Sequence, residues 1–310
     1  MKKTTRRANS IHFSDIAHVP VTSPDGTRLT GFSTGGGPGP TIVLCNSMLG
    51  GVDAWRELIE AFAPLHRIVG WQYRGIKTAA KNVSIAQHAT DLFSVLDAMQ
   101  VDSAVLVGWS AGSRVAMEAV SIAPDRFLGV TLVCGVLQRP LRRLVEPVAG
   151  PFAALAPALG NLAAEIAPYA PSLWNVVGLG ARSRTVHDLL RLIGAVSNSV
   201  PHQRLGELLA DTTSLPLKRV MQMVRAIDRH VVDHAADQPD IPTLIIGGSA
   251  DPLCPRGDVQ WLANRWNRAE TMIVPSAGHL LPVEFAELFA LRLEKFIRTN
   301  TGFDALAASA

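Results

Sequence analysis

Short apolar runs rich in β-branched residues alternate with amphipathic stretches along most of the chain. Two leading runs, 16–21 and 28–32, flank the turn Pro24-Asp25-Gly26 and predict a β-hairpin. The continuous apolar run 41–45 is typical of a strand that is buried on both faces of a parallel sheet. The further predicted strands are 67–72, 104–107, 129–134, 242–246 and 271–274, and the predicted helices are 53–62, 85–99, 111–121, 259–267 and 284–297.

This alternation predicts an α/β fold with a doubly wound, mostly parallel sheet and right-handed crossovers. It stops at Arg139-Pro140 and resumes at Pro242, and the interval has helical spacing but no convincing strand. An all-helical insertion after a strand of a parallel sheet covers the carboxyl edge, where ligands bind. We therefore expect a core of residues 13–138 and 240–310, a helical cap of 139–239, and a disordered basic head of 1–12.

The first half of the predicted cap is almost free of charge. Between Pro147 and Ala181 the only charged residue is Glu165. Five prolines divide this stretch into pieces much shorter than the roughly twenty apolar residues that a membrane-spanning helix needs. We expect no transmembrane span and interpret the stretch as an apolar wall over a substrate pocket, with contact to a membrane surface as the alternative.

Composition narrows the class of protein further. The 310 residues are 48% hydrophobic and 18% charged, which excludes intrinsic disorder. The net charge of +3 is small, and four basic residues lie within the first seven, so no nucleic-acid footprint is expected. Three scattered cysteines fit buried free thiols in a reducing compartment, and no apolar run follows the basic head as in a secretory signal. These features favour a cytoplasmic enzyme.

A candidate nucleophile stands directly after the strand 104–107. The sequence Gly108-Trp109-Ser110-Ala111-Gly112 is G-x-S-x-G between a predicted strand and a predicted helix, the context of a nucleophile elbow. The turn is tight, and a β-carbon at either glycine would collide with neighbouring backbone. The serine would project above the sheet at the positive end of the following helix.

A nucleophilic serine needs a base, and the base needs an orienting acid. In proteins with this elbow the acid and then the histidine follow the serine along the chain. Of the downstream histidines only His279 lies just past a late strand, and His187, His202, His230 and His234 belong to the predicted cap. Asp251 follows the strand 242–246, whereas no carboxylate follows the strand 129–134. We therefore predict Ser110, Asp251 and His279 as the catalytic residues.

The oxyanion hole should combine the backbone N–H of Ala111 with one from the loop after the strand 41–45. In that loop, Asn46-Ser47-Met48-Leu49-Gly50-Gly51, we select Met48 as the donor. The substrate-binding residues that we expect around the site are Asn46, Ser47, Trp109 and Leu280.

Together these motifs resemble the serine-nucleophile α/β-hydrolase family, in its capped and cofactor-free form, from residue 13 to 298. The specific markers are 108–112, Gly248–Asp251 with Pro255, Gly278-His279 with Pro282 and Glu284, and the pair Arg74-Gly75. Asn46-Ser47 stands where His-Gly is common, and it is similar to the Asn-Ser of enol-lactone hydrolases. Ile76-Lys77 replaces the usual small residues, and the longer, more apolar cap disfavours a small anionic lactone.

We interpret the chain as a serine hydrolase of carboxylic esters, lactones included, with an apolar small-molecule substrate. The resemblance implies no cofactor and no metal. Alternatives with the same three residues are a C–C bond hydrolase of diketone-like substrates and a thioesterase or acyltransferase, and a further alternative is a non-catalytic binding protein. The pair His230/His234 has a spacing that zinc can use but no evident third ligand. Residues 35–40 precede a strand and lack the Lys-Ser/Thr of a phosphate loop.

Overall fold

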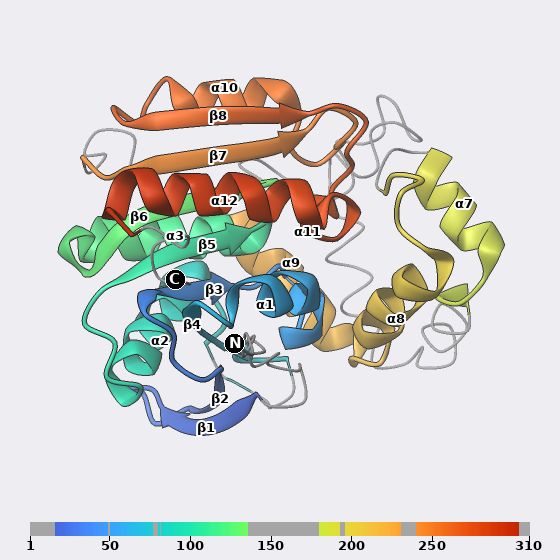
Figure 1. Cartoon of the computed structure of the whole chain (residues 1–310). Helices are drawn as coiled ribbons and strands as arrows, with labels where there is room; N and C mark the ends of the chain where they lie inside the picture. The colour runs from blue at the N-terminus through green and yellow to red at the C-terminus, as the bar shows by residue number, and fades with distance from the viewer. Residues whose placement is uncertain are drawn as a thin grey trace, which may run out of the picture.

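In the computed structural model of the chain, eight strands form one sheet in the order β1-β2-β4-β3-β5-β6-β7-β8 (Figure 1). The strands are β1 (Ala17–Thr22), β2 (Arg28–Ser33), β3 (Gly39–Cys45), β4 (His66–Trp71), β5 (Ala104–Trp109), β6 (Phe127–Val133), β7 (Thr243–Gly248) and β8 (Ala269–Val274). The pairs β1–β2 and β2–β4 are antiparallel, and all other neighbours are parallel. The structure describes residues 16–48, 50–76, 80, 82–135, 180–192, 196–230 and 240–303.

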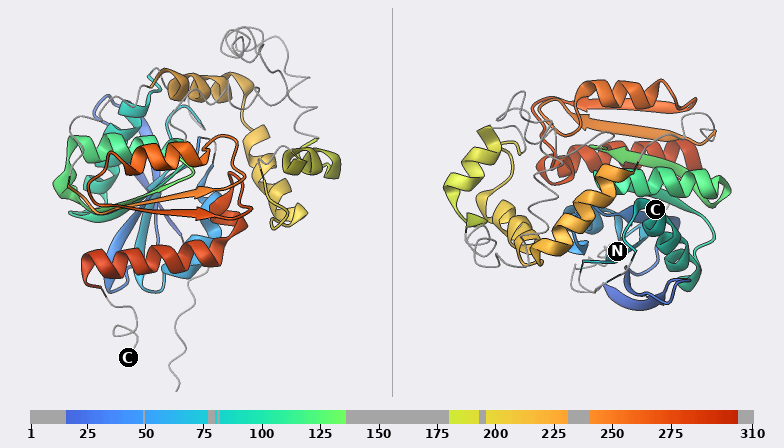
Figure 2. Two further views of the ribbon diagram at one scale, coloured as in Figure 1. Left: turned by 90° about the horizontal axis from the view of Figure 1, so that it is seen from above. Right: turned by 180° about the vertical axis from the view of Figure 1, so that it is seen from behind.

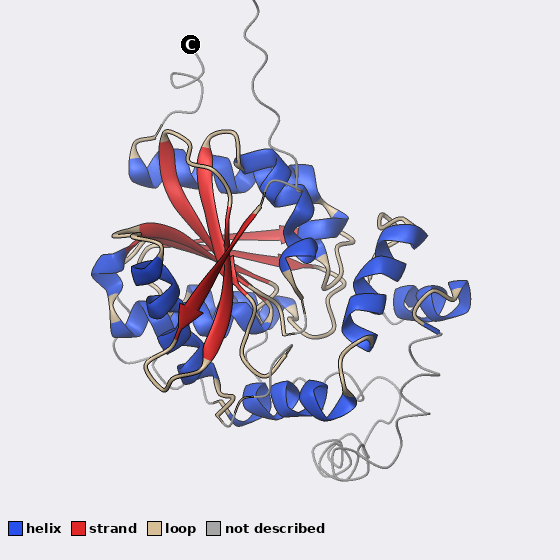
Figure 3. Cartoon of the chain, turned by 90° about the horizontal axis from the view of Figure 1, so that it is seen from below, coloured by secondary structure: helices blue, strands red, loops and turns tan. Residues whose placement is uncertain are grey.

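Helices cover both faces of the twisted sheet (Figure 3). The core helices are α1 (Arg56–Phe62), α2 (Ile85–Ala98), α3 (Ala111–Ile122), α10 (Arg256–Ala263), α11 (Leu281–Glu284) and α12 (Ala286–Thr301). Helix α3 packs against α2, while α12 packs against α1 and lies on the opposite face from α3 and α10 (Figure 2). The predicted doubly wound, mostly parallel sheet is therefore confirmed.

The middle of the sheet is buried on both faces, as the continuous apolar runs predict. Every residue of β5 and β7 is buried, and so are the last four residues of β3. These strands carry Val, Ile and Leu without alternation because helices cover both of their sides. All three cysteines are buried free thiols, which confirms that prediction.

Three predicted helices differ from the observed ones. The predicted helix 53–62 begins with the 3₁₀ turn Val52–Trp55, and only Arg56–Phe62 is α-helical. The predicted helix 259–267 starts earlier, directly after Pro255, which lacks an N–H and suits the position before a first turn. The predicted helix 284–297 is two helices, because Phe285 (φ −132°, ψ 49°) leaves the helical conformation between α11 and α12.

Between β6 and β7 the structure describes the helices α7 (Arg184–Leu192), α8 (His202–Thr213) and α9 (Leu217–Arg229), and no strand among these residues. Helices α7 and α8 lie beyond the ends of β7 and β8 that carry the arrowheads (Figure 1). Residues 136–179, with most of the uncharged stretch, lie outside the described residues, so the division into core and cap stays a prediction. No described helix is long and apolar enough to cross a membrane.

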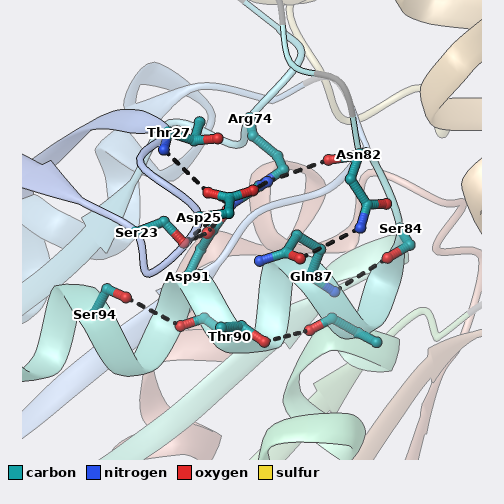
Figure 4. Close-up of polar contacts among 11 residues, drawn as sticks. Ser23, Asp25, Thr27, Arg74, Asn82, Ser84, Gln87, Thr90, Asp91 and Ser94 are labelled. Carbon is teal, nitrogen blue, oxygen red and sulfur yellow. Dashed lines mark hydrogen bonds and ion pairs between the residues drawn. The ribbon is translucent and has the colours of Figure 1, made fainter.

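A buried arginine fixes the turn after β4 (Figure 4). The guanidinium of Arg74 donates to both carboxylate oxygens of Asp91 on α2, at 2.7 and 2.5 Å, and both side chains are fully buried. The same group donates to Asp25 at 2.6 Å and to the hydroxyl of Ser23 at 3.0 Å in the turn between β1 and β2. The bidentate ion pair thus joins the Arg74-Gly75 turn to α2, and the bonds to Asp25 and Ser23 join the same turn to the hairpin.

We expect Asp91→Asn to lower the free energy of unfolding by about 3–5 kcal/mol, because the Arg74 guanidinium loses its fully buried ion pair and keeps the pair with Asp25, whose side chain is 39% exposed. Urea denaturation measures this change. The matched control is Asp97→Asn on the same helix, whose side chain is 68% exposed in its pair with Arg126 and should cost no more than about 1 kcal/mol. Equal, small losses in both variants would contradict this account of the turn.

Candidate active site

Ser110 occupies a sharp turn between β5 and α3. Its backbone has φ 57° and ψ −116°, a conformation that a residue with a side chain rarely adopts. A β-carbon on Gly112 would lie 2.0 Å from the carbonyl oxygen of Cys45, and one on Gly108 would lie 2.5 Å from the carbonyl oxygen of Gly112. The expectation that neither glycine tolerates a side chain is confirmed, and the reason is the close packing of α3 on the end of β3.

The structure brings the three predicted catalytic side chains into one hydrogen-bonded chain. His279 Nε2 lies 2.9 Å from Ser110 Oγ, and His279 Nδ1 lies 2.8 Å from Asp251 Oδ2. A carboxylate only accepts hydrogen bonds, so Nδ1 carries the proton and Nε2 is free to accept one from the serine. The arrangement can therefore deprotonate the hydroxyl of Ser110 as it attacks.

Asp251 is held by backbone groups of its own loop. Its second oxygen accepts the backbone N–H groups of Leu253 at 2.8 Å and Cys254 at 3.1 Å. Burial raises the pKa of Asp251, but the neighbouring His279 and the hydrogen bonds outweigh burial, so its pKa lies below the usual value. The carboxylate stays ionised at neutral pH and holds the imidazole in one orientation.

Backbone contacts fasten the loops that carry Asp251 and His279 to each other. A β-carbon on Gly248 would lie 2.2 Å from the carbonyl oxygen of Ala277, and the N–H of Ala250 donates to the same oxygen at 2.9 Å. From the other side, the indole of Trp109 donates to the carbonyl oxygen of His279 at 3.0 Å. Trp109, an expected substrate contact, is 2% exposed and ties the loop of the base to the nucleophile turn.

The two expected oxyanion donors lie at free backbone positions. Ala111 is the first residue of α3, and Met48 is half-buried against the core. Within the described part of the chain, neither N–H donates a hydrogen bond to the protein. Both N–H groups are therefore available to a ligand, as an oxyanion hole requires.

Two other expected substrate contacts have roles in the protein itself. The amide of Asn46 donates to the carbonyl oxygen of Trp71 at 2.7 Å and accepts the indole N–H of Trp55 at 2.8 Å, and the residue is 1% exposed. Leu280 is half-buried and packs against both the main core and a second apolar cluster of residues 196–205. Ser47 is half-buried in the loop after β3. The amide of Asn46 holds this loop in place.

The chemistry of the donor set disfavours a metal at this site. Among the described residues, one group has ligand atoms close enough for an ion: Cys134, Asp251 and His279, within 4.8 Å of one another. Burial and the nearby Asp251 raise the pKa of the Cys134 thiol, its Sγ donates to the carbonyl oxygen of Gly278 at 3.8 Å, and Asp251 and His279 already bond to each other. Of the two histidines in the zinc alternative, the structure describes His230, whose Nε2 lies 3.3 Å from Glu118 Oε2. His234 lies outside the described residues.

Sequence reasoning missed the role of one residue beside the base. The resemblance marks Glu284 without a role, yet its carboxylate accepts the backbone N–H groups of Gly278 and Leu280, on either side of His279. No local signal marks this contact. The one available clue was an acidic residue among apolar ones, five positions after the histidine.

Comparisons with known proteins agree with the fold. The model of the family described as alpha/beta hydrolase fold matches residues 40–286. The 3-oxoadipate enol-lactonase 1 of Acinetobacter baylyi is 24% identical over 94% of this chain and 98% of its own length. The carbamate hydrolase RutD of Azorhizobium caulinodans is 34% identical, over 32% of this chain and 38% of that protein. An esterase structure from Exiguobacterium antarcticum, 15% identical, superposes with a TM-score of 0.71 over 91% of this chain and all of the esterase.

Gly112→Ala should reduce turnover by at least about 100-fold, because the new β-carbon pushes α3, and Ser110 with it, away from Cys45. The control is Gly257→Ala in α10, where a β-carbon meets no atom within 4 Å and should add about 0.5–1 kcal/mol of stability. Ester hydrolysis and thermal melting of both variants check this. Wild-type turnover in Gly112→Ala would contradict the packing argument.

Proposed function

The chain belongs to the α/β-hydrolase fold family, and from that premise we propose that it is a serine hydrolase that cleaves carboxylic esters, lactones included, through an acyl-enzyme. The observation that carries the proposal is the continuous hydrogen-bonded chain from Ser110 through His279 to Asp251. The strained backbone of Ser110 and the two unused N–H groups beside it support the same reaction.

In the proposed reaction, Ser110 Oγ attacks the carbonyl carbon while His279 Nε2 takes its proton. The negative charge that develops on the carbonyl oxygen is stabilised by the N–H groups of Met48 and Ala111. The tetrahedral intermediate collapses, and His279 delivers the proton to the leaving alkoxide. A water molecule then attacks the acyl-enzyme by the same route and releases the acid, and Asp251 stabilises the imidazolium in both halves. These residues need no cofactor for this chemistry.

We further propose that residues 139–239 form a cap and that the acyl pocket is apolar. The support is the stretch from Pro147 to Ala181, with Glu165 as its single charge. The name of the enol-lactonase relative favours a lactone, and that of the esterase neighbour an open ester. C–C bond hydrolysis would need a cation for a substrate carboxylate, which the apolar half of the cap lacks. The three cysteines form no disulfide, which supports a cytoplasmic location.

The three residues should behave as one catalytic unit. Ser110→Ala, His279→Ala and Asp251→Asn should each lower kcat roughly 10⁴-fold or more, with melting temperatures near that of the wild type. The double variant Ser110→Ala/His279→Ala should be barely worse than either single one, because either change already removes the attack. Steady-state hydrolysis of p-nitrophenyl esters provides the measurement. Substantial turnover by Ser110→Ala would contradict the proposed serine mechanism.

Activity should also rise with acyl length. Each methylene that moves from water into an apolar pocket gains roughly 0.8 kcal/mol, or about fourfold in kcat/KM. We expect kcat/KM to climb from acetyl to about hexanoyl esters. A charge in the uncharged stretch, as in Leu159→Asp, should flatten the climb while acetyl esters change little. If kcat/KM of the wild type stays flat or falls with acyl length, the apolar acyl pocket is rejected, but the proposed serine mechanism is not contradicted.

A further inference from the structure

The carboxylate of Glu284 gathers three backbone N–H groups from two separate parts of the chain. Oε2 accepts the N–H of Gly278 at 2.6 Å, and Oε1 accepts the N–H of Leu280 at 3.2 Å. Oε1 also accepts the N–H of Ser197 at 3.2 Å. Glu284 is 7% exposed, and besides these three main-chain donors the side chain of Ser197 also bonds to its carboxylate.

Two of the three donors belong to the residues immediately before and after His279. The carboxylate therefore grips the backbone on both sides of the base. Trp109 holds the carbonyl oxygen of His279 itself, and Asp251 holds its ring. Glu284 is thus the third group, after Trp109 and Asp251, that holds His279 in position.

The third donor lies between β6 and β7, far from Glu284 in the sequence. Ser197 is followed by Val200 and Leu205, which with Val196 form a buried apolar cluster. Leu280, the residue before α11, and Val283, within α11, pack against that cluster. The residues 196–205 therefore rest on the segment that carries His279, and Glu284 bonds to both.

We propose that Glu284 is a positioning residue, which holds His279 in line with Ser110 and ties residues 196–205 to the loop of the base. The inference rests on the proposed function. It differs from a merely structural role because it predicts a specific loss of turnover: a misplaced imidazole slows proton transfer and leaves ground-state binding of the substrate largely unchanged.

Glu284→Gln tests the grip on His279. The amide keeps the shape of the carboxylate but replaces one acceptor oxygen with a donor, which faces an N–H group that it cannot satisfy. We expect kcat to fall about 10- to 100-fold with KM within about threefold of the wild-type value. The matched control is Glu287→Gln. Glu287 is an exposed glutamate three positions further along the chain, and the variant should hydrolyse esters at the wild-type rate.

Glu284→Asp is the second variant if the glutamine form does not fold. Its carboxylate is one methylene shorter and cannot reach both sides of the loop, so the same loss of kcat is expected. Circular dichroism melting identifies the folded variants. A folded Glu284 variant with kcat within twofold of the wild type overturns the proposal, as does a change confined to KM.

Ser197→Pro tests the tie to residues 196–205, because proline removes the N–H that Glu284 accepts from that side together with the hydroxyl of Ser197, whereas alanine removes the hydroxyl alone. The control Ser197→Ala keeps this N–H. We expect the proline variant to raise KM for long-chain esters at least about threefold over the alanine variant, while kcat for acetyl esters stays near the wild-type value. Identical kinetics for the two variants would remove this part of the proposal.

The wild type and His279→Ala are measured alongside, so that failure of the proposed function can be distinguished from failure of the proposed role of Glu284. An inactive wild type, or an active His279→Ala variant, contradicts the proposed function. An active wild type, an inactive His279→Ala variant and an unimpaired Glu284→Gln variant overturn only the role of Glu284.

Discussion

The site depends on one close approach between two backbones. Helix α3 can touch the end of β3 only because Gly112 presents no side chain to the carbonyl oxygen of Cys45. That contact sets the start of α3 directly after β5 and forces Ser110 into its unusual conformation. The hydroxyl of Ser110 then meets His279, and the N–H of Ala111 is left without a protein acceptor. Strain at a single residue is sustained by the packing of the whole central sheet.

The same principle extends to the other loops of the site. Gly248 lets the backbone after β7 pack on Ala277, so the acid and the base are set at a fixed distance by main-chain contacts. Trp109 and Glu284 then each form hydrogen bonds with the backbone of the loop that carries His279. The chemistry is carried by flexible side chains, but their placement is decided by glycines, backbone amides and buried groups.

Local patterns predicted the strands, and they selected Ser110, Asp251 and His279, which the structure places in one hydrogen-bonded chain. The apolar runs marked the buried strands because helices cover both faces of the sheet, and G-x-S-x-G marked the turn because its geometry excludes β-carbons. Features created by distant contacts could not be predicted in this way. The internal hydrogen bond of Asn46 to Trp71 and the bond that Glu284 accepts from Ser197 both join residues far apart in the sequence.

The central claim is that Ser110 is the nucleophile, and covalent labelling tests it most directly. The chain is titrated with a fluorophosphonate, and the modified peptide is identified by mass spectrometry. The account predicts one adduct per chain, on Ser110, with hydrolytic activity lost in proportion to labelling and no adduct in Ser110→Ala. An adduct on another residue, or full ester hydrolysis after complete labelling of Ser110, would contradict it.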